Sequence, residues 1–327
     1  MYYTETHSTD PYYNLAFEEY ILLHKRRGDW LLLWQNAHTV VVGLNQNTLE
    51  EIDAEVVREK GIHVVRRSTG GGAVYHDLGN LNYSFIADAG DEARLSMGRF
   101  TEAICQALAT MGVHGEAMGR NDITIQGKKV SGTAQRLDHG RILHHGTLLF
   151  RTDPLAIESA LRADPEKFRS KSTKSIRSRV GNISDFLPKE TTIEEFKNAL
   201  RRNLTADSFA YIELTPGEIG EVERLADGKY RTWAWNYGAS PPYTMKRKAR
   251  CDGGTLEVSA SIKNGCIEAI RFCGDFMARI PLDPLAAALA GRRFDRDEVA
   301  SVFGGFALDE MFGGITETEI LDILFSG

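Results

Sequence analysis

DITIQGKKVSGTAQR, residues 122–136, is the stretch of sequence that decides the fold. Two arms rich in β-forming residues flank Gly127-Lys128, a pattern typical of a tight β-hairpin. A second turn signal at Asp138-His139-Gly140 leads into ILHHGTLLF, residues 142–150, which predicts another strand. Strands joined by such short turns pair antiparallel, so this region does not follow regular βαβ alternation.

The segments around these hairpins predict further strands and several helices. A first helix is expected after Asn14, with Asn14 as its cap and Gly28 as its end. Apolar periodicity predicts strands at 30–34, 39–44, 62–67 and 81–88, and helices at 52–61, 97–112, 154–163, 192–205 and 216–227. We therefore predict an α+β fold, in which a mixed or antiparallel sheet is flanked by helices.

The chain also predicts a domain boundary in its last third. Pro241-Pro242 followed by MKRKAR is the most linker-like stretch, because prolines break regular structure and the charges keep it solvated. We expect a domain over 1–240, a linker over 241–248, and a small α/β domain over 249–327. The small domain is expected to hold a hairpin about Asn264-Gly265 and helices near 282–291, 295–303 and 316–325.

Composition excludes several classes of function. The 327 residues carry a net charge of −6, and the part from residue 249 onward is acidic, so neither part has the basic excess of a nucleic-acid-binding protein. No apolar stretch approaches the ~20 residues of a membrane span, and MYYTETHSTD does not resemble a leader, so we expect a cytoplasmic protein without a membrane partner. The four cysteines lack C-x-x-C spacing and signal neither a metal knuckle nor a disulfide framework.

RRSTGGGAVYHD, residues 66–77, is the first candidate site. Three consecutive glycines lose more chain entropy on folding than other residues, and a close approach of backbone to a ligand is one compensation. Arg66 or Arg67 is suited to bind a carboxylate or phosphate that also meets the glycine N–H groups. A flexible turn is the alternative. The sequence has neither a Walker nor a Rossmann glycine pattern.

The second candidate site is the hairpin itself. Asn121 and Asp122 open one arm and Lys129 lies in the other, so the hairpin brings the three residues to neighbouring strands. They are suited to a nucleotide or a metal-bound phosphate, with the lysine stabilising developing negative charge. Alternatively, Asn121-Asp122 caps a strand and the lysines are solvated turn charges.

His144-His145 is a poor metal signal, because adjacent strand residues point to opposite faces of a sheet. At most one of the two is expected to face a site. A basic loop over 162–180 is suited to close over phosphates, although a solvated surface loop explains its charge equally well. No cysteine or serine lies in a context that indicates a catalytic nucleophile.

Taken together, five separated motifs resemble those of the lipoate–protein ligase family, in that family's order. They are RRSTGGGAVYHDLGN, GRNDITIQGKKVSGTAQR, HHGTLL, SIRSRVGNI and WAWNYGASP. The resemblance implies a catalytic domain of the class II synthetase and biotin ligase type, followed by a small accessory domain. It also implies that the protein activates lipoate with ATP and Mg²⁺ to lipoyl-adenylate. The lipoyl group would then pass to a specific lysine of a lipoyl domain.

The resemblance assigns roles residue by residue. Lys129 matches the catalytic lysine, and Asp122 the residue that contacts the magnesium. The lipoyl-binding residues it implies are Arg67, Thr69, Gly70, Gly71, Gly72, Ala73, His76, Arg136 and His145. The nucleotide-binding residues it implies are Tyr75, Asn121, Asp122, Lys129, Ser175, Arg177 and Val180. The implied reaction also needs an apolar slot for the acyl chain, and we expect Ala73, Val74, Tyr75 and the strand 40–42 to form its walls.

Three other functions are weighed against the ligase. An octanoyltransferase of the same catalytic-domain family would need a nucleophilic cysteine, and residues 131–185 contain none. A non-catalytic accessory protein that binds an acyl-adenylate or a lipoyl domain would not need Lys129, Asn121 and Asp122. Biotin ligase is disfavoured, because its glycine loop is interleaved with arginine.

The resemblance also implies the partners. They are lipoate or octanoate, and the lipoyl domains of 2-oxoacid dehydrogenase complexes together with the glycine cleavage H protein. A monomer is expected.

We predict that replacing Lys129 with alanine lowers the rate of adenylate formation and acyl transfer by about 10²–10³-fold, because a preorganised cation at the developing negative charge is lost. Single-turnover kinetics with lipoate and Mg-ATP measure the effect. Near-normal rates in the variant would contradict the role given to Lys129.

Overall fold

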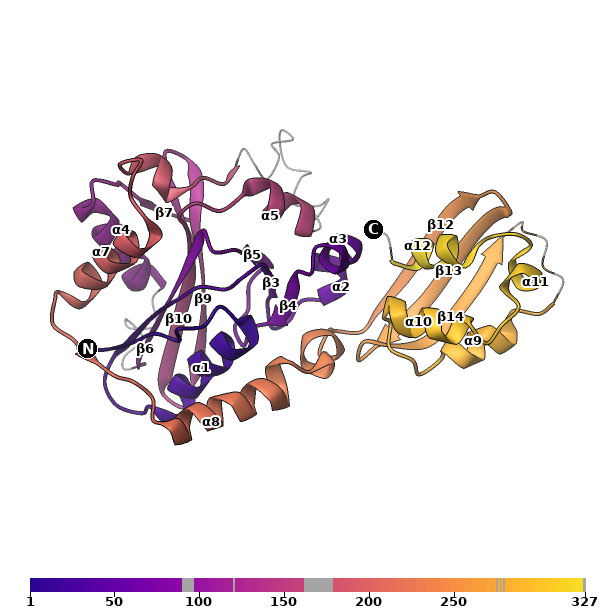
Figure 1. Ribbon diagram of the computed structural model, residues 1–327, viewed down its shortest axis with the longest axis horizontal. Coiled ribbons are helices and arrows are strands. Elements are labelled where there is room, and N and C mark those ends of the chain that lie inside the picture. The colour runs from indigo at the N-terminus through magenta and orange to yellow at the C-terminus, as the bar shows by residue number, and fades with distance from the viewer. Residues whose placement is uncertain are drawn as a thin grey trace. The chain divides into compact units, whose positions relative to one another are not determined.

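The structure is a computed structural model that describes residues 1–89, 97–119, 121–161, 179–274, 276, 278 and 280–325. The chain divides into two compact units. The first unit contains Met1–Asn45 and Lys60–Thr232, and the second contains Gln46–Glu59 and Trp233–Gly327. Figure 1 labels their helices and strands.

A large mixed sheet forms the centre of the first unit. Its spatial order is β11 (Ala210–Tyr211), β1 (Tyr2–Thr4), β2 (Trp30–Trp34), β6 (Asn80–Asp88), β10 (Arg141–Leu149), β9 (Lys128–Asp138), β8 (Asp122–Ile125) and β7 (Glu116–Met118). β1 runs parallel to both its neighbours, and every pair from β2 to β7 is antiparallel. The predicted α+β class is confirmed.

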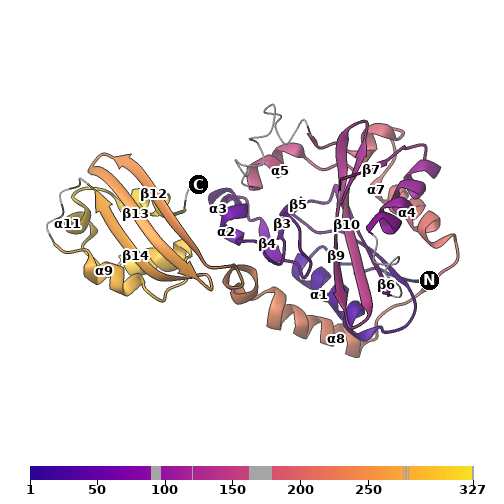
Figure 2. The same cartoon turned by 180° about the vertical axis from the view of Figure 1, so that it is seen from behind.

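The hairpin turns lie close to where the sequence places them. Gln126 and Gly127 have φ of 50° and 76°, so they form the turn between β8 and β9 and Lys128 already begins β9. The turn therefore lies one residue earlier than predicted, because the residue pair with two positive φ angles determines it. His139 and Gly140, with φ of 43° and 78°, form the turn from β9 into β10, which is the long hairpin seen in Figure 2.

A second, three-stranded sheet of the first unit carries the glycine cluster. Its order is β4 (His63–Arg66), β3 (Thr39–Val42) and β5 (Val74–His76), with β3 parallel to β4 and antiparallel to β5. The cluster of glycines at 70–72 connects β4 to β5. Its ends are therefore held by two strands of one small sheet.

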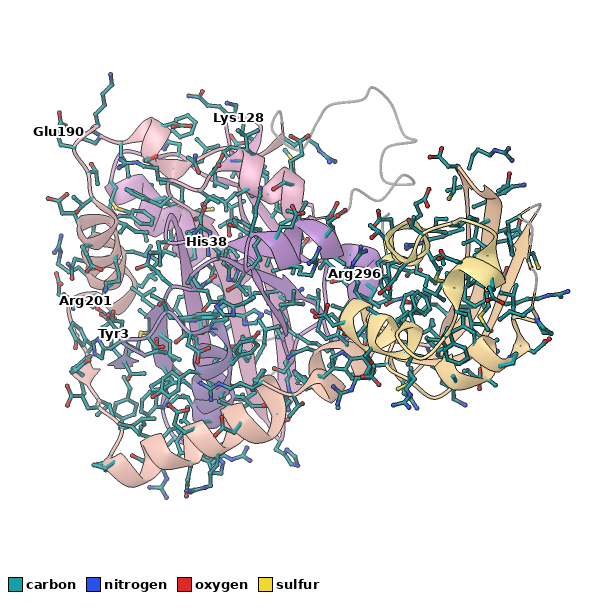
Figure 3. All side chains as sticks on the ribbon, turned by 45° about the vertical axis from the view of Figure 1, so that its right-hand side comes forward. Tyr3, His38, Lys128, Glu190, Arg201 and Arg296 are labelled. Atoms are coloured by element: carbon teal, nitrogen blue, oxygen red, sulfur yellow. The ribbon has the colours of Figure 1, made fainter. Side chains whose placement is uncertain are left out.

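Helices cover the large sheet on both faces. One face packs against α4 (Met97–Thr110) and α7 (Ile193–Thr205) through a core that contains Tyr83, Phe150 and Phe196. On α7, the Arg201 guanidinium lies 5.5 Å from the ring centroid of Tyr3 (Figure 3). α1 (Pro11–His24) packs against α8 (Pro216–Leu225) and the following π-helical turn η3 (Ala226–Tyr230) (Figure 1). The short elements α5 (Pro154–Ala160) and η2 (Ile183–Phe186) complete the described first unit.

The first helix begins earlier than the sequence predicts. Asp10 is the N-cap of α1, since its carboxylate accepts a hydrogen bond from the Tyr12 N–H at 2.9 Å, and Pro11 occupies the first helical position. Asn14 is buried inside the helix, where its amide donates to the Ser8 and Gln35 carbonyls. Asn14 therefore joins the helix to neighbouring loops and does not cap it.

The second unit has its own antiparallel sheet and its own core. The sheet contains β12 (Tyr243–Cys251), β13 (Gly254–Lys263) and β14 (Cys266–Gly274), and the turn about Asn264-Gly265 is confirmed. The remaining elements are α2 (Thr48–Glu51), α3 (Ala54–Glu59), the π-helical turn η4 (Ala234–Gly238), α9 (Asp283–Leu289), α10 (Arg296–Phe303), α11 (Leu308–Phe312) and α12 (Glu317–Phe325).

The predicted linker over 241–248 is corrected by this sheet. Most of it lies in β12, where the exposed residues Lys246, Lys248 and Arg250 alternate with half-buried Met245 and Ala249. Lys246, Lys248 and Arg250 thus occupy one face of the strand, because strand side chains alternate between two faces. Arg247 lies on the other face, where its Nη1 donates to the Leu324 carbonyl at 2.8 Å. The two units divide instead between Thr232 and Trp233. None of the helices in the described ranges is long and apolar enough to cross a membrane.

We predict that Gly79→Ala destabilises the protein. The Gly79 carbonyl accepts hydrogen bonds from the N–H groups of Phe150 and Arg151, and a Cβ at residue 79 would lie 2.1 Å from the Arg151 carbonyl oxygen. The forced backbone shift should lower the free energy of unfolding by about 1–3 kcal/mol, measured by urea denaturation.

Gly228→Ala is the matched control, because no heavy atom lies within 4 Å of its added Cβ. An unchanged urea midpoint in Gly79→Ala would show that the backbone adapts without cost.

Candidate functional site

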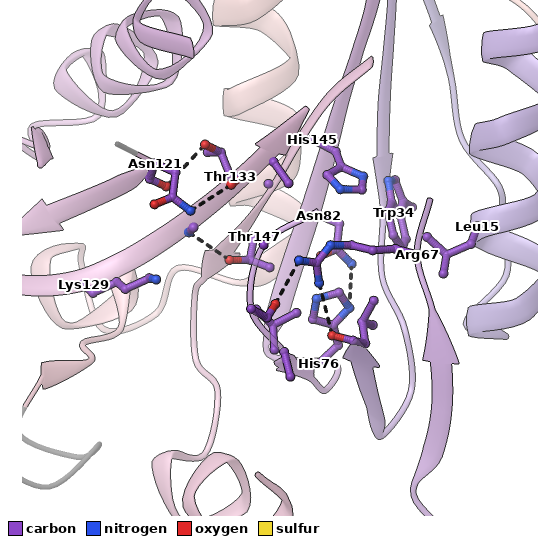
Figure 4. Close-up of a pocket in the computed structure, with 18 residues that line it drawn as sticks. Leu15, Trp34, Arg67, His76, Asn82, Asn121, Lys129, Thr133, His145 and Thr147 are labelled. Atoms are coloured by element: carbon purple, nitrogen blue, oxygen red, sulfur yellow. Dashed lines mark hydrogen bonds between the residues drawn. The ribbon is translucent and has the colours of Figure 1, made fainter. Parts of the chain in front are cut away.

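One cavity of the first unit collects residues from the large sheet, from α1 and from the glycine segment (Figure 4). It is lined by Leu15, Trp34, Val41, Arg67, Gly71, Gly72, Ala73, Val74, His76, Asn82, Asn121, Lys129, Gly132, Thr133, Ala134, His145, Gly146 and Thr147. Two sequence segments predicted as separate candidate sites, 66–77 and 121–129, therefore meet at one cavity.

Strand register explains why these side chains meet. Across the large sheet, Trp34 pairs with Asn82 and Asn82 with Thr147. In the adjacent row, Ser84 pairs with His145 and His145 with Ala134. Residues two apart on a strand share a face, so all of these side chains lie on the face opposite the α4 and α7 core. The sequence analysis missed the contributions of Trp34, Asn82 and Thr147, because single strands do not reveal their register.

Arg67 shapes the glycine segment from within. Its Nη2 donates to the carbonyls of Gly70 and Gly72 at 2.6 and 2.9 Å, and its Nη1 donates to the Val41 carbonyl at 3.2 Å. The guanidinium is buried, and burial lowers the pKa of Arg67 to about 10, so the side chain remains a cation near neutral pH. The Arg67 N–H groups, which the sequence analysis expected to bind a substrate anion, thus mostly donate to backbone carbonyls.

Two further features fix the glycine segment. Arg66 is fully buried and its Nη1 donates to the carbonyls of Gly43 and Leu44. Gly43 allows the close approach of the segment, since a Cβ there would lie 2.0 Å from the Gly71 carbonyl oxygen. The segment is therefore a loop held by hydrogen bonds and not a flexible turn. We call residues 67–72 the glycine loop.

The two adjacent histidines separate as the sequence predicts. His145 lines the cavity, and its Nε2 lies 2.8 Å from the Thr69 hydroxyl. His144 points to the opposite core, where its ring stacks on Phe100 with centroids 4.6 Å apart. Burial lowers the pKa of His144 to about 3.

His76 lines the cavity and holds a buried polar atom without a partner among the described residues. It is 3% exposed, and its Nδ1 lies 3.2 Å from the Asn36 amide nitrogen, which can only donate, so Nδ1 accepts. Burial, together with the charge of Arg67, lowers the pKa of His76 to about 3. The ring is therefore neutral with its proton on Nε2, and this N–H has no partner among the described residues. It is a buried donor at the cavity wall.

The hairpin residues come together as expected. The Lys129 ammonium lies 2.7 Å from the Asp122 carboxylate, and the two side chains are 40% and 33% exposed. Asn121 donates from its amide to the Thr133 carbonyl at 3.0 Å. Gly132 leaves room for the lysine, because a Cβ there would lie 3.2 Å from Lys129 Nζ. A half-exposed cation thus stands at the cavity beside an amide and a carboxylate.

Several predicted site residues lie outside the cavity lining. Thr69 and Gly70 belong to the glycine loop but do not line the cavity, and both contact Arg67. The Arg136 guanidinium binds the carboxylates of Glu19 and Asp138, each at 2.6 Å. The Tyr75 hydroxyl lies 2.7 Å from His38 Nδ1. Val180 forms a backbone bridge with Lys129, and the predicted contacts of Ser175 and Arg177 fall outside the described residues.

Sequence reasoning also missed Glu18. This residue of α1 is 2% exposed and its carboxylate contacts His145. A signal was present in the sequence, because Glu18-Glu19 interrupts the apolar run of residues 15–23 in a predicted helix. In the structure that helix is buried around most of its circumference. Buried carboxylates require partners, so a consecutive pair in such a helix indicates a polar site.

Comparison with known proteins agrees with this geometry. Residues 10–205 match the family model of the lipoyl protein ligase A/B catalytic domain, and residues 240–324 match the bacterial lipoate protein ligase C-terminus. The chain belongs to the lipoate–protein ligase family. It is 40% identical to lipoate-protein ligase LplJ of Bacillus subtilis over 97% of both chains, and 38% identical to lipoate–protein ligase 1 of Staphylococcus aureus, again over 97% of both.

Solved structures give the same family. The chain resembles a bi-partite lipoate protein ligase from Thermoplasma acidophilum, studied with its E2 lipoyl domain (TM-score 0.65, 33% identity, covering 73% of this chain and 96% of that one). A T. acidophilum protein solved with bound lipoic acid gives a TM-score of 0.63 at 30% identity, covering 72% and 96%. A lipoate-protein ligase A bound with ATP gives 0.62 at 28%, covering 73% and 97%.

The depressed histidine pKa values predict how stability depends on pH. Between about pH 6.5 and 3 the unfolded chain binds protons at His76 and His144 that the folded protein does not bind, so the free energy of unfolding falls as pH falls. Each such proton contributes a slope of about 1.4 kcal/mol per pH unit. Removing one group with His144→Phe should therefore flatten the dependence between about pH 6 and 4, as measured by urea unfolding.

Ile142→Val on the same strand is the control, since it loosens the core without removing a titrating group. Equal slopes in wild type and His144→Phe would show that His144 takes up its proton in the folded state.

Proposed function

We propose that the protein activates lipoate with ATP to lipoyl-adenylate and transfers the lipoyl group to a lysine of a lipoyl domain. The observation that carries the proposal is the meeting of the glycine loop with Asn121 and Lys129 at one cavity. Membership of the ligase family supports it, as do relatives in the same family that were solved with lipoic acid and with ATP.

The cavity is suited to hold the two ends of a lipoyl-adenylate differently. Leu15, Trp34, Val41, Ala73 and Val74 give an apolar slot for the acyl chain, while Asn121 and Lys129 stand at the polar end. Burying an acyl chain needs apolar contacts, whereas the phosphate needs fixed donors and positive charge. We assign the acyl chain to the loop side and the nucleotide to the hairpin side.

The first step is an attack of anion on anion. A lipoate carboxylate oxygen forms a bond to the α-phosphorus of ATP, the bond from that phosphorus to the bridging oxygen breaks, and pyrophosphate leaves. Negative charge grows on the α-phosphoryl oxygens, and the Lys129 ammonium is the cation of the cavity lining on the hairpin side. The His76 Nε2–H is suited to donate to an oxygen of the acyl carboxyl group.

The second step transfers the acyl group. The amine of the acceptor lysine attacks the acyl carbonyl carbon, the bond from that carbon to the phosphate oxygen breaks, and AMP leaves while the amine loses a proton. Lys129 stabilises the oxyanion of the tetrahedral intermediate and the leaving phosphate. The same cation therefore serves both steps.

We assign magnesium to Asp122. Mg²⁺ commonly binds through one or two carboxylates together with substrate phosphates. Asp122 is one-third exposed and contacts Lys129 of the cavity lining, which fits that pattern. The described residues contain no group of three or more acidic, cysteine or histidine side chains that would hold a metal by themselves. When bound, the ion neutralises phosphate charge that Lys129 alone would face.

We further propose that the first unit is the catalytic part and the second unit an accessory part, with action in the cytoplasm as a monomer. The acceptors proposed are the lipoyl domains of 2-oxoacid dehydrogenase complexes and the glycine cleavage H protein. Octanoate is a second acyl substrate that the slot would accept, since the two acids share an eight-carbon acyl chain. The other lipoyl-binding and nucleotide-binding residues that the resemblance implies are proposed in those same roles.

The octanoyltransferase alternative gains no support from the structure. None of the four cysteines, all within the described ranges, lines the cavity. Cys105 packs at the core on the other face of the sheet, and burial raises the pKa of its thiol, which disfavours the reactive thiolate.

We predict that an apo lipoyl domain incubated with this protein, lipoate and Mg-ATP gains the mass of one lipoyl group, and that omission of ATP or chelation of magnesium abolishes the gain. Intact-mass spectrometry measures the increment. A parallel tube with octanoyl carrier protein and no ATP is the control.

An octanoyl increment without ATP would make the protein a transferase and contradict the proposal. ATP binding without pyrophosphate release or any increment would support a non-catalytic accessory role instead.

A further inference from the structure

Glu18 is a buried carboxylate to which the reaction as described gives no role. It lies on α1 with 2% of its surface exposed, and it does not line the cavity. Placing a carboxylate in the interior is costly unless hydrogen bonds and charges compensate it. Its partners therefore indicate what it does.

Both carboxylate oxygens of Glu18 face His145. The distances from His145 Nδ1 to Oε1 and Oε2 are 2.9 and 3.0 Å. Ser84 donates its hydroxyl to Oε1 at 2.5 Å, and Ser84 in turn accepts from the Trp34 indole N–H at 2.8 Å. Glu18 is thus fixed from the sheet side and aimed at one imidazole.

This arrangement determines which nitrogen of a neutral His145 ring carries the proton. An ionised carboxylate only accepts hydrogen bonds, so His145 Nδ1 must carry a proton. In the neutral imidazole the other nitrogen, Nε2, is then the acceptor. Nε2 lies 2.8 Å from the Thr69 hydroxyl, which is therefore the donor in that contact.

Thr69 connects the imidazole to the glycine loop. Its hydroxyl oxygen accepts from Arg67 Nε at 3.0 Å while its hydrogen is directed to His145. Arg67 holds the carbonyls of Gly70 and Gly72. The hydrogen bonds thus run in one donor direction from the loop to the helix, from Arg67 through Thr69 and His145 to Glu18.

We propose that Glu18 is a positioning residue: its carboxylate sets the tautomer of His145, and through Thr69 it holds the glycine loop in the shape that binds the acyl chain. This inference rests on the proposed function, because it assigns the loop to acyl binding. Ser84 and Trp34 of the large sheet keep the carboxylate in place, so the sheet and the glycine loop are connected through Glu18 and His145.

The test variant is Glu18→Gln, which preserves side-chain volume. The carboxamide oxygen would take the Ser84 hydroxyl, and its NH₂ would then face His145 Nδ1. The ring should change to the Nε2–H tautomer, and the Thr69 hydroxyl would then lose the acceptor of its hydrogen. Glu5→Gln is the matched control, since Glu5 is also a hydrogen-bonded, largely buried carboxylate of the first unit, with Tyr3 and Lys197 as partners.

The first readout needs no activity. Long-range ¹H–¹⁵N correlation spectra of the full-length protein labelled at histidine report the tautomer of His145, assigned with a His145→Gln variant. We expect Nδ1–H in wild type and in Glu5→Gln, and Nε2–H in Glu18→Gln. An unchanged tautomer in Glu18→Gln would overturn the proposal, whatever the protein catalyses.

The second readout separates positioning from mere stability. Glu18→Gln should raise the KM for lipoate by about 10–100-fold, the loss expected for a hydrogen-bond relay built on a charged acceptor, while the KM for ATP stays within about twofold. Adding Glu18→Gln to a Thr69→Ala protein should cause no further loss, because the relay is already broken.

Equal increases of both KM values, or a full further loss in the double variant, would overturn the positioning role. If wild type binds ATP but no acyl acid, the proposed function fails, and the spectra still decide whether Glu18 controls His145.

Discussion

A buried cation wrapped in backbone carbonyls is the constraint on which the site depends. The Arg67 guanidinium replaces water with carbonyls of the glycine loop and of β3, so these hydrogen bonds hold the loop against the small sheet. Glycines are required because the chain passes so close to itself, as the 2.0 Å contact that a Cβ at Gly43 would make with the Gly71 oxygen shows. Loop entropy is thus lost on folding and not on binding, which favours a preorganised cavity.

The two sides of the cavity differ in how far water reaches the interactions that hold them. The loop side is closed by buried hydrogen bonds between the glycine loop, His145 and α1, where a low dielectric strengthens each contact. The hairpin side carries half-exposed Lys129 and Asp122, whose pairing water screens. A side chain that must exchange partners during a reaction is better placed on the hairpin side, and a surface that must keep its shape is better placed on the loop side.

The sequence predicted turns and side-chain orientation within a strand well. It predicted less well which residues from distant segments come into contact. Turns at His139-Gly140 and Asn264-Gly265 follow from residue types that tolerate positive φ, and the opposite orientations of His144 and His145 follow from strand geometry alone. The contact between Asp122 and Lys129 follows from the hairpin. Trp34 and Asn82 join the cavity only through the register of three strands distant in sequence, and the strand in 243–251 was hidden because its charges suggested a solvated linker.

The path of the chain makes the second unit discontinuous in sequence. Gln46–Glu59 belongs to it, although this segment lies between β3 and β4 of the first unit. Its Thr48 hydroxyl donates to the Asn236 carbonyl at 2.6 Å, and Ser240 accepts from the Thr48 N–H at 3.2 Å. A single cut near residue 232 therefore does not yield two intact pieces, because the N-terminal fragment would retain a segment whose partners lie on the other fragment. The chain passes between the two units three times. Separating the units, or permuting the chain circularly, therefore has to take all three connections into account.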